Sequence, residues 1–243
     1  MTISVHRLSQ CRSLAELTEP AAEAVAEHAR EVAFRARERL IPLGQPPERL
    51  LILTEGLAKL VGVSVTGHER ILNIYRPDDM VGPSVLMESP KNDLEVAAMS
   101  HVRALSVSRR DLLIVCRAHP SLILSLAREV SRQLMAMTDR VLTATSAEVS
   151  IRLSQLLLEF ADATEGGRES LVPLAHPLTQ ESMSQIIGAS RPHTSTVLRN
   201  LEACGAVQRR SGRGLLVRPA RLQHIVENGD LDPVPAETLR LSA

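Results

Sequence analysis

Residues 178–217 read LTQESMSQIIGASRPHTSTVLRNLEACGAVQRRSGRGLLV, and this stretch decides the C-terminal fold. Thr179 can cap a first helix, which ends at Gly188, where a left-handed backbone costs glycine little. Ser190 can cap a second helix over about residues 190–204. The apolar side chains that face inward on the two helices are Leu178, Met183, Ile186, Ile187, Val197, Leu198 and Leu201. Two short capped helices joined at a glycine predict a helix-turn-helix.

The polar side chains that remain near solvent predict a DNA-reading surface. Polar residues in the N-terminal half of a second helix are what reading of the major groove requires. Gly205 ends this helix, and residues 207–210 and 215–218 then predict a basic hairpin that can lie along the phosphate backbone as a wing. We assign DNA binding to Thr179, Ser190, Arg191, His193, Thr194, Ser195, Thr196, Arg199, Arg209, Arg210 and Arg213.

Charge is divided unevenly along a chain whose formal net charge is zero. Residues 178–224 contain seven arginines and two acids, a net charge of +5, whereas residues 225–243 contain four acids and one arginine, a net charge of −3. A basic segment within a neutral protein fits a surface that contacts phosphates, although an ordinary solvated face has the same composition. Aromatic residues make up 1% of the chain, so stacking of bases on aromatic side chains is not expected.

Several other classes of function find no support in the sequence. It contains no Ser-His-Asp signature, phosphate-binding glycine loop or HExxH motif, so we expect no catalytic residues and no enzyme. Cys11, Cys116 and Cys204 lack C-x-x-C spacing, so we expect neither disulfides nor a metal site. No apolar run reaches the roughly 18 residues of a membrane span, and the N-terminus does not resemble a secretion signal. We therefore expect a cytoplasmic protein without a membrane partner.

Residues 30–107 precede the helical part and read as short strands. Apolar, β-branched segments alternate there with turn signals such as Glu55-Gly56 and Thr66-Gly67, which predicts an antiparallel barrel or sandwich. The clearest strands are expected at residues 50–54, 57–65, 70–75, 94–98 and 104–107. A short amphipathic helix is expected before them, at residues 20–28.

A long helix is expected to begin at His119-Pro120-Ser121. Apolar or small residues follow at alternating spacings of four and three, which is the a/d seam of a coiled coil and favours a homodimer over an internal core helix. The seam residues are Ile123, Ala127, Val130, Leu134, Met137, Val141 and Ala144. A second apolar face, which can pack internally at the same time, consists of Leu122, Leu126, Met135 and Leu142.

The expected fold class is therefore α+β, with an N-terminal antiparallel β-barrel, a long helix and a C-terminal winged helix-turn-helix. After the long helix, another helix is expected at residues 147–161, followed by a break at Glu165-Gly166-Gly167. The expected parts are a sensor domain at 1–118, a dimerisation helix at 119–146, a winged helix-turn-helix domain at 147–226 and a mobile tail at 227–243.

Three phrases of the sequence resemble the CRP–FNR superfamily of catabolite-activator and fumarate-nitrate regulators. Residues 185–207, QIIGASRPHTSTVLRNLEACGAV, resemble its DNA-binding signature. Residues 50–60, LLILTEGLAKL, and residues 76–82, RPDDMVG, resemble parts of its cyclic-nucleotide-binding-like jelly-roll barrel. The resemblance covers about residues 30–224. It implies a homodimeric regulator that binds a palindromic operator in double-stranded DNA, senses a signal in the barrel and contacts RNA polymerase.

The recognition helix departs from the family pattern in two positions. Where members of the family often carry a Glu and an Arg that read C and G, this chain has Pro192 and Thr196. Neither residue can make the bidentate contact to guanine that Arg makes. We therefore expect an operator that differs from the common half-site of the family, read by Arg191, His193, Ser195 and Thr196.

The sensor also departs from the family pattern, and its signal stays open. Family members that bind cyclic AMP place a Glu after the glycine and an Arg-Ser pair on the cyclic phosphate, but this chain has Pro83 and Asp93-Leu94. Cyclic AMP of the usual kind is therefore not expected, nor is an iron–sulfur cluster, because only Cys11 stands near the N-terminus. By position, the effector pocket is expected at Gly82, Pro83, Ser84, Val85, Leu94 and Glu95.

Several alternatives remain beside this interpretation. Haem can be held by a histidine, and His68 and His101 are the candidates in the barrel. Cys204 is either an inert core residue or a redox-sensitive thiol near the basic hairpin. Two alternatives concern the function of the whole protein. One is a DNA-binding regulator that needs no effector, and the other is a ligand-sensing dimer that does not bind DNA.

Overall fold

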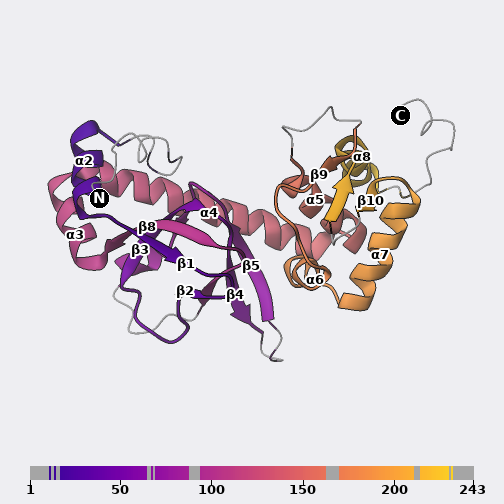
Figure 1. Ribbon diagram of the computed structural model, residues 1–243, viewed down its shortest axis with the longest axis horizontal. Coiled ribbons are helices and arrows are strands. Elements are labelled where there is room, and N and C mark those ends of the chain that lie inside the picture. The colour runs from indigo at the N-terminus through magenta and orange to yellow at the C-terminus, as the bar shows by residue number, and fades with distance from the viewer. Residues whose placement is uncertain are drawn as a thin grey trace. The chain divides into compact units, whose positions relative to one another are not determined.

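Two antiparallel four-stranded sheets face each other in the N-terminal part of the chain (Figure 1). The computed structural model describes residues 11, 14, 17–64, 67, 69–87, 94–162, 170–210, 214–229 and 231. It divides into two units, Met1–Thr138 and Asp139–Ala243. The division falls within the long helix α4 (Pro120–Ser146), which is continuous across it.

The sheets of the first unit have the strand orders β1-β8-β3-β6 and β2-β7-β4-β5. The strands are β1 (Arg30–Phe34), β2 (Arg39–Ile41), β3 (Arg49–Glu55), β4 (Ala58–Val63), β5 (Glu69–Tyr75), β6 (Met80–Val81), β7 (Glu95–Ala98) and β8 (Val102–Ser108). Five of them lie where the alternation of apolar segments and turn signals predicted strands. The expected antiparallel β-barrel is therefore confirmed, with three short strands in addition.

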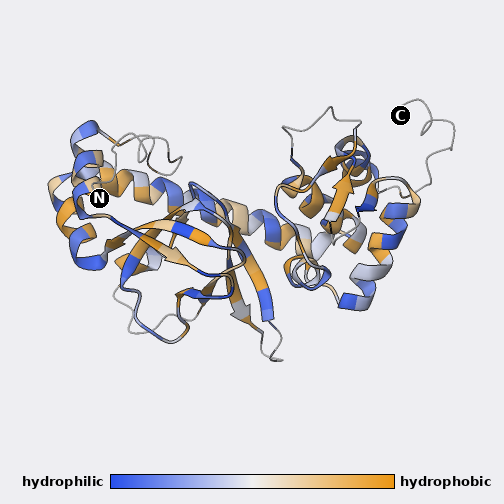
Figure 2. Cartoon of the chain, viewed as in Figure 1, coloured by the Kyte–Doolittle hydropathy of each residue, from blue (hydrophilic) through white to orange (hydrophobic). Residues whose placement is uncertain are grey.

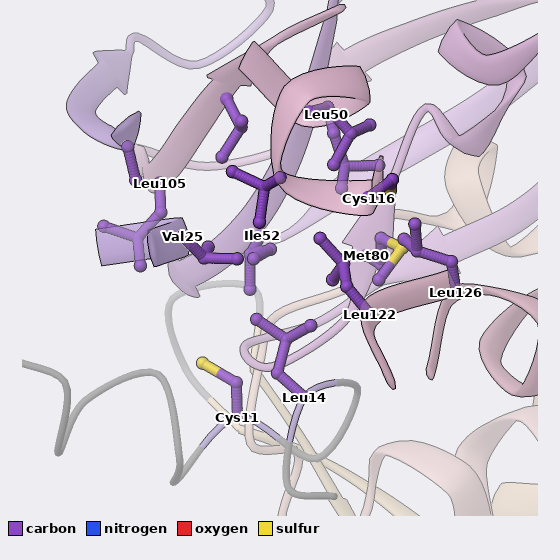
Figure 3. Close-up of a cluster of buried hydrophobic side chains, with 14 of the residues drawn as sticks. Cys11, Leu14, Val25, Leu50, Ile52, Met80, Leu105, Cys116, Leu122 and Leu126 are labelled. Atoms are coloured by element: carbon purple, nitrogen blue, oxygen red, sulfur yellow. The ribbon is translucent and has the colours of Figure 1, made fainter. Parts of the chain in front are cut away.

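Strand β3 is buried on both faces, which explains its unbroken apolar run. Successive side chains of a strand point to opposite faces of the sheet. Leu51 and Leu53 pack between the two sheets. Leu50 and Ile52 pack instead in a second cluster, against helices (Figure 3). This helix-side core also contains Val25, Met80, Leu105, Cys116, Leu122 and Leu126.

The helices that supply this core are α2 (Glu19–His28), α3 (Arg109–Ala118) and the beginning of α4. Helix α2 agrees with the amphipathic helix expected at residues 20–28. Helix α3 was not predicted, although its cap is a clear local signal: Ser108 Oγ accepts the backbone N–H of Asp111 at 3.1 Å. Leu122 and Leu126 are 1% and 2% exposed, so the first half of the second apolar face of α4 packs internally, as expected.

The second unit is built around α5 (Val149–Phe160), which contacts three helices that follow it in the chain. Those helices are α6 (Gln180–Ile187), α7 (Arg191–Ala203) and α8 (Pro219–Asn228). A three-stranded sheet of order β10-β11-β9 completes the unit, with β9 at Val172–Pro173, β10 at Val207–Arg210 and β11 at Gly214–Val217. The expected winged helix-turn-helix is confirmed.

The chain after β11 differs from the sequence prediction. Helix α8 was not predicted, and Leu222 and Ile225 of this helix are fully buried. Residues 227 and 228 belong to the helix, so the expectation of a tail from residue 227 is wrong for these two residues. The rest of the expected tail, apart from residues 229 and 231, and the expected break at residues 165–167 lie outside the described residues.

Candidate DNA-binding surface

Helix α6 is positioned by the local signals that the sequence predicted. Thr179 Oγ1 accepts the backbone N–H of Ser182 at 3.0 Å, and Gly188 ends the helix with φ 70° and ψ 31°. The buried side chains of α6 are Met183, Ser184 and Ile187. Because Ser184 is small, α6 and α7 can approach each other closely, as a helix-turn-helix requires.

Ser190 is the N-cap of helix α7, and its Oγ accepts the backbone N–H of His193 at 3.3 Å. Pro192 lies in the first turn, where its missing N–H leaves no hydrogen bond unmade. Hydrophobic and hydrophilic residues follow each other along the helix (Figure 2). The buried side is Thr194, Val197, Leu198 and Leu201, so the predicted apolar stripe is confirmed and one residue longer than expected.

The assignment of Thr194 to DNA binding is wrong. Its exposed fraction is 0%, and its Oγ1 donates a hydrogen bond to the carbonyl oxygen of Ser190 at 3.0 Å. Residues at i, i+3, i+4 and i+7 share one face of a helix, and Thr194 is the first member of the buried set. Thr194 therefore helps to pack α7 and cannot reach a base edge.

The remaining residues assigned on α7 lie at the surface. Arg191, His193, Thr196 and Arg199 are exposed, and Ser195 is half-buried. Thr179 and Ser190 are also exposed, but the hydroxyl of each one is already used to cap its helix. The structure therefore brings together four exposed polar side chains and one half-buried side chain on a helix that its own core holds in place.

The wing follows α7 as the hairpin of β10 and β11, in which Val207 pairs with Val217 and Arg210 pairs with Gly214. Its second strand ends at Val217, one residue before the predicted end. Val207 is buried, whereas Arg209 and Arg210 are exposed. Arg213 lies outside the described residues.

Arg209 is held by an acid that sequence reasoning did not single out. Its Nε donates to Glu202 Oε1 at 2.7 Å, across the junction between α7 and β10. The side chains of Arg209 and Glu202 are 51% and 26% exposed, so water screens the pair only in part. Glu202 is one of only two acids among residues 178–224, and this isolated negative charge was the available signal.

Cys204 ends α7 within the core of the unit. It is 1% exposed, and its Sγ donates to the carbonyl oxygen of Leu201 at 3.4 Å. A thiol with so little access to solvent is a poor target for oxidants. This placement supports an inert core residue over a redox-sensitive thiol.

Comparison with families of known proteins identifies both parts of the chain. A model of the Crp-like helix-turn-helix domain matches residues 151–225, and a model of the cyclic nucleotide-binding domain matches residues 31–119. The chain belongs to the CRP–FNR superfamily. The chain is a CRP-family transcription regulator with a helix-turn-helix DNA-binding domain, and α7 is the second helix of that helix-turn-helix.

Relatives and solved structures agree with this membership. The CRP-like cAMP-activated global transcriptional regulator of Mycobacterium tuberculosis is 26% identical over 200 residues, which cover 82% of this chain and 89% of that protein. The c-di-GMP responsive global regulator CLP of Xanthomonas campestris has a TM-score of 0.71 at 16% identity, covering 82% of this chain and 99% of that one. FixK2 of Bradyrhizobium japonicum has a TM-score of 0.69 at 20% identity, covering 85% and 98%. At these identities the two structures show a shared fold.

The a/d seam predicted on α4 lies at the surface of this CRP–FNR chain. Its five large side chains, Ile123, Val130, Leu134, Met137 and Val141, are 52%, 43%, 63%, 36% and 62% exposed. Ala127 and Ala144 are exposed as well. The second apolar face is divided, because Leu122 and Leu126 are buried whereas Met135 and Leu142 are 62% and 60% exposed.

The residues predicted to form the effector pocket are buried or half-buried. Gly82 has φ 78°, and a Cβ there would lie 2.5 Å from Ile41 Cδ1. It precedes the short 3-10 helix η2 (Pro83–Leu86), in which Val85 is 0% exposed and packs in the helix-side core. Pro83, Ser84, Leu94 and Glu95 are half-buried. Val85 is therefore not available to a ligand in this conformation.

Charged groups of both signs surround the described part of this segment, and Arg109 Nε donates to the carbonyl oxygen of Val85 at 2.9 Å. Neither η2 nor β7 contains Lys or Arg, and the Glu95 carboxylate pairs with Arg39 Nε at 2.7 Å. A hollow in the described surface adjoins this segment; its lining includes Phe34, Arg39, Ile41, Gln45 and Arg49, and Ile41 and Arg49 lie beside Gly82. Of the haem candidates, His101 is exposed and His68 lies outside the described residues. Within the described ranges, no helix is both long and apolar enough to cross a membrane.

A polar cluster around the buried Glu129 connects α4 to the turn before Gly82, and sequence reasoning missed it. Glu129 is 4% exposed, and its carboxylate accepts hydrogen bonds from Arg132 at 2.6 and 2.9 Å and from Gln133 at 2.7 Å. Gln133 also donates to the carbonyl oxygen of Met80 at 2.9 Å, and Arg132 lies 3.3 Å from Asp79 Oδ1. The hydrogen bond and charge of Glu129 raise the pKa of Arg132. The cluster fixes α4 to the β5–β6 turn of the barrel.

Proposed function

We propose that this regulator reads DNA sequence with α7 and binds a palindromic operator as a homodimer. The observation that carries the proposal is the outer side of α7, where Arg191, His193, Thr196 and Arg199 are exposed on a capped and firmly packed helix. Each base pair presents a distinct set of donors and acceptors in the major groove, which a rigid row of polar side chains can distinguish. The exposed Arg210 of the wing adds a phosphate contact beside it.

The seam on α4 supports the homodimer. Exposure of large apolar side chains to water is unfavourable in free energy. At heptad spacing, pairing with a second identical helix buries these side chains. In a two-fold symmetric dimer, the two copies of α7 meet half-sites about 34 Å apart, one turn of the DNA helix. This geometry supports an operator with two inverted half-sites.

The barrel supports regulation by a signal that acts near Gly82, and cyclic AMP bound in the usual way is not expected. The relatives include regulators named as cAMP-activated, but η2 and β7 of this chain themselves contain one acid, Glu95, and no Lys or Arg. The buried cluster around Glu129 supplies a physical connection from the turn before Gly82 to α4. A regulator that needs no effector is the alternative. Contact with RNA polymerase and a cytoplasmic location are part of the same proposal.

Fluorescence anisotropy with duplex DNA tests this function. Duplexes selected by the protein from a random library are compared with scrambled duplexes over a series of NaCl concentrations. A regulator of this kind binds the selected duplex at least about 10³-fold more tightly than the scrambled duplex. Its affinity for both duplexes falls steeply as the salt concentration rises. A ligand-sensing dimer without DNA function shows neither the preference nor the salt dependence.

A further inference from the structure

A short chain of hydrogen bonds runs along the outer side of α7. Arg199 Nη2 donates to Thr196 Oγ1 at 3.1 Å, and Thr196 Oγ1 donates to the carbonyl oxygen of Pro192 at 3.2 Å. All three residues are exposed. Their spacing of i, i+4 and i+7 places them on one face of the helix, on the side away from the stripe that contains Val197 and Leu201.

The hydrogen bond to Thr196 determines where the Arg199 guanidinium lies. Side chains on a helix lean toward its N-terminus, and a bond to the residue three positions earlier holds the guanidinium beside the preceding turn. That turn belongs to the half of a recognition helix that enters the groove. One N–H of the guanidinium is used by Thr196, and four of its five N–H groups remain to donate.

Thr196 itself is a poor base reader in this geometry. Its single hydroxyl hydrogen is donated to Pro192, so it cannot also be donated to a base. Arg191 stands one residue before Pro192, about 100° around the helix from it, and therefore on the flank of this outer face. Arg199 is the residue whose donors are both central on the face and held in position.

We propose that Arg199, positioned by Thr196, reads one guanine in each half-site by donating to its O6 and N7. These two acceptors match the paired N–H groups of a guanidinium. Thr196 acts through Arg199 and is a positioning residue. The inference rests on the proposed function, because it assigns a base to the surface that α7 presents to DNA.

Selection of duplexes from a random library by the wild-type protein and by four variants tests the proposal. The variants are R199A, T196V, T196S and, as a reader on the flank, R191A. The best duplex is then bound again with each guanine replaced in turn by 7-deazaguanine, which lacks the N7 acceptor but pairs normally.

We expect one guanine in each half-site to respond to Arg199. Its replacement by 7-deazaguanine weakens binding by the wild-type protein but not by R199A, and R199A loses about 5- to 150-fold on the selected duplex. T196V loses the preference for the same guanine because valine cannot accept the hydrogen bond, whereas T196S keeps it. R191A leaves the preference at that base pair unchanged.

Three results decide between the inference and the function on which it rests. If R199A binds selected and scrambled duplexes with equally reduced affinity and keeps every base preference, Arg199 contacts phosphate and the inference is wrong, while the proposed function stands. If T196V keeps the guanine preference just as T196S does, Thr196 does not position Arg199. If the wild-type protein enriches no sequence at all, the proposed function itself fails.

Discussion

Replacement of Leu134 by alanine tests the seam on α4 most sharply, because Met135 provides a matched control on the next face. Full burial of a leucine side chain contributes about 1.5–3 kcal/mol. Leu134 is 63% exposed in the single chain, so a partner helix can gain about 1–2 kcal/mol from it. Two-fold symmetry doubles this to about 2–4 kcal/mol, which raises the dimer dissociation constant about 30- to 1000-fold.

Sedimentation velocity over a range of protein concentrations measures this dissociation constant. Met135 is 62% exposed and lies one residue further along the helix, so Met135→Ala removes a similar apolar area from a face outside the seam. We expect Leu134→Ala to weaken the dimer and Met135→Ala to change it by less than threefold or so. If Met135→Ala weakens the dimer as much as Leu134→Ala, the a/d register on α4 is wrong.

Three further predictions concern the DNA-binding unit and the thiols. Arg210→Ala should reduce the slope of log DNA affinity against log salt concentration by about 0.9. Arg209→Ala should reduce this slope by less, because Glu202 already neutralises Arg209. Equal reductions in the two variants would contradict the ion pair. Ser190→Ala should lower the free energy of unfolding in urea by about 1 kcal/mol and Ser190→Asp should restore it, whereas no loss would contradict the cap. Burial raises the pKa of the Cys116 thiol, so little thiolate forms at pH 8. Native Cys116 should therefore react slowly with an aromatic disulfide. Rapid modification of Cys116, mapped by mass spectrometry, would contradict its burial.

The features that the sequence predicted best are those encoded by neighbouring residues. Gly188 and Ser190 set the turn of the helix-turn-helix through their own backbone preference and hydroxyl group, and both take the expected roles. The heptad spacing on α4 is equally local, and its role as a dimer seam stays a prediction. Thr194 was misassigned because its polarity was weighed above its position, although the same i, i+3, i+4, i+7 spacing that buries Leu201 also includes Thr194.

The contacts that were missed depend on how distant segments pack. The pairing of Glu202 with Arg209 requires the end of α7 and the first wing strand to meet in one particular register. The cluster around Glu129 likewise requires a turn fifty residues earlier in the chain to lie against α4. A charged residue in a helix reads as solvent-facing from sequence alone, and only the fold shows that Glu129 is buried.

In the proposed function, the exposed face of α7 reads the base sequence of DNA. The most direct test compares the ratio of dissociation constants for scrambled and selected duplexes between the wild-type protein and a variant with Arg191, Thr196 and Arg199 all replaced by alanine. These three side chains are exposed, so the variant should keep its fold. We predict a ratio of about 10³ or more for the wild type and a ratio near one for the variant, with the salt-dependent affinity of the wing retained. An unchanged ratio in the variant would contradict the claim.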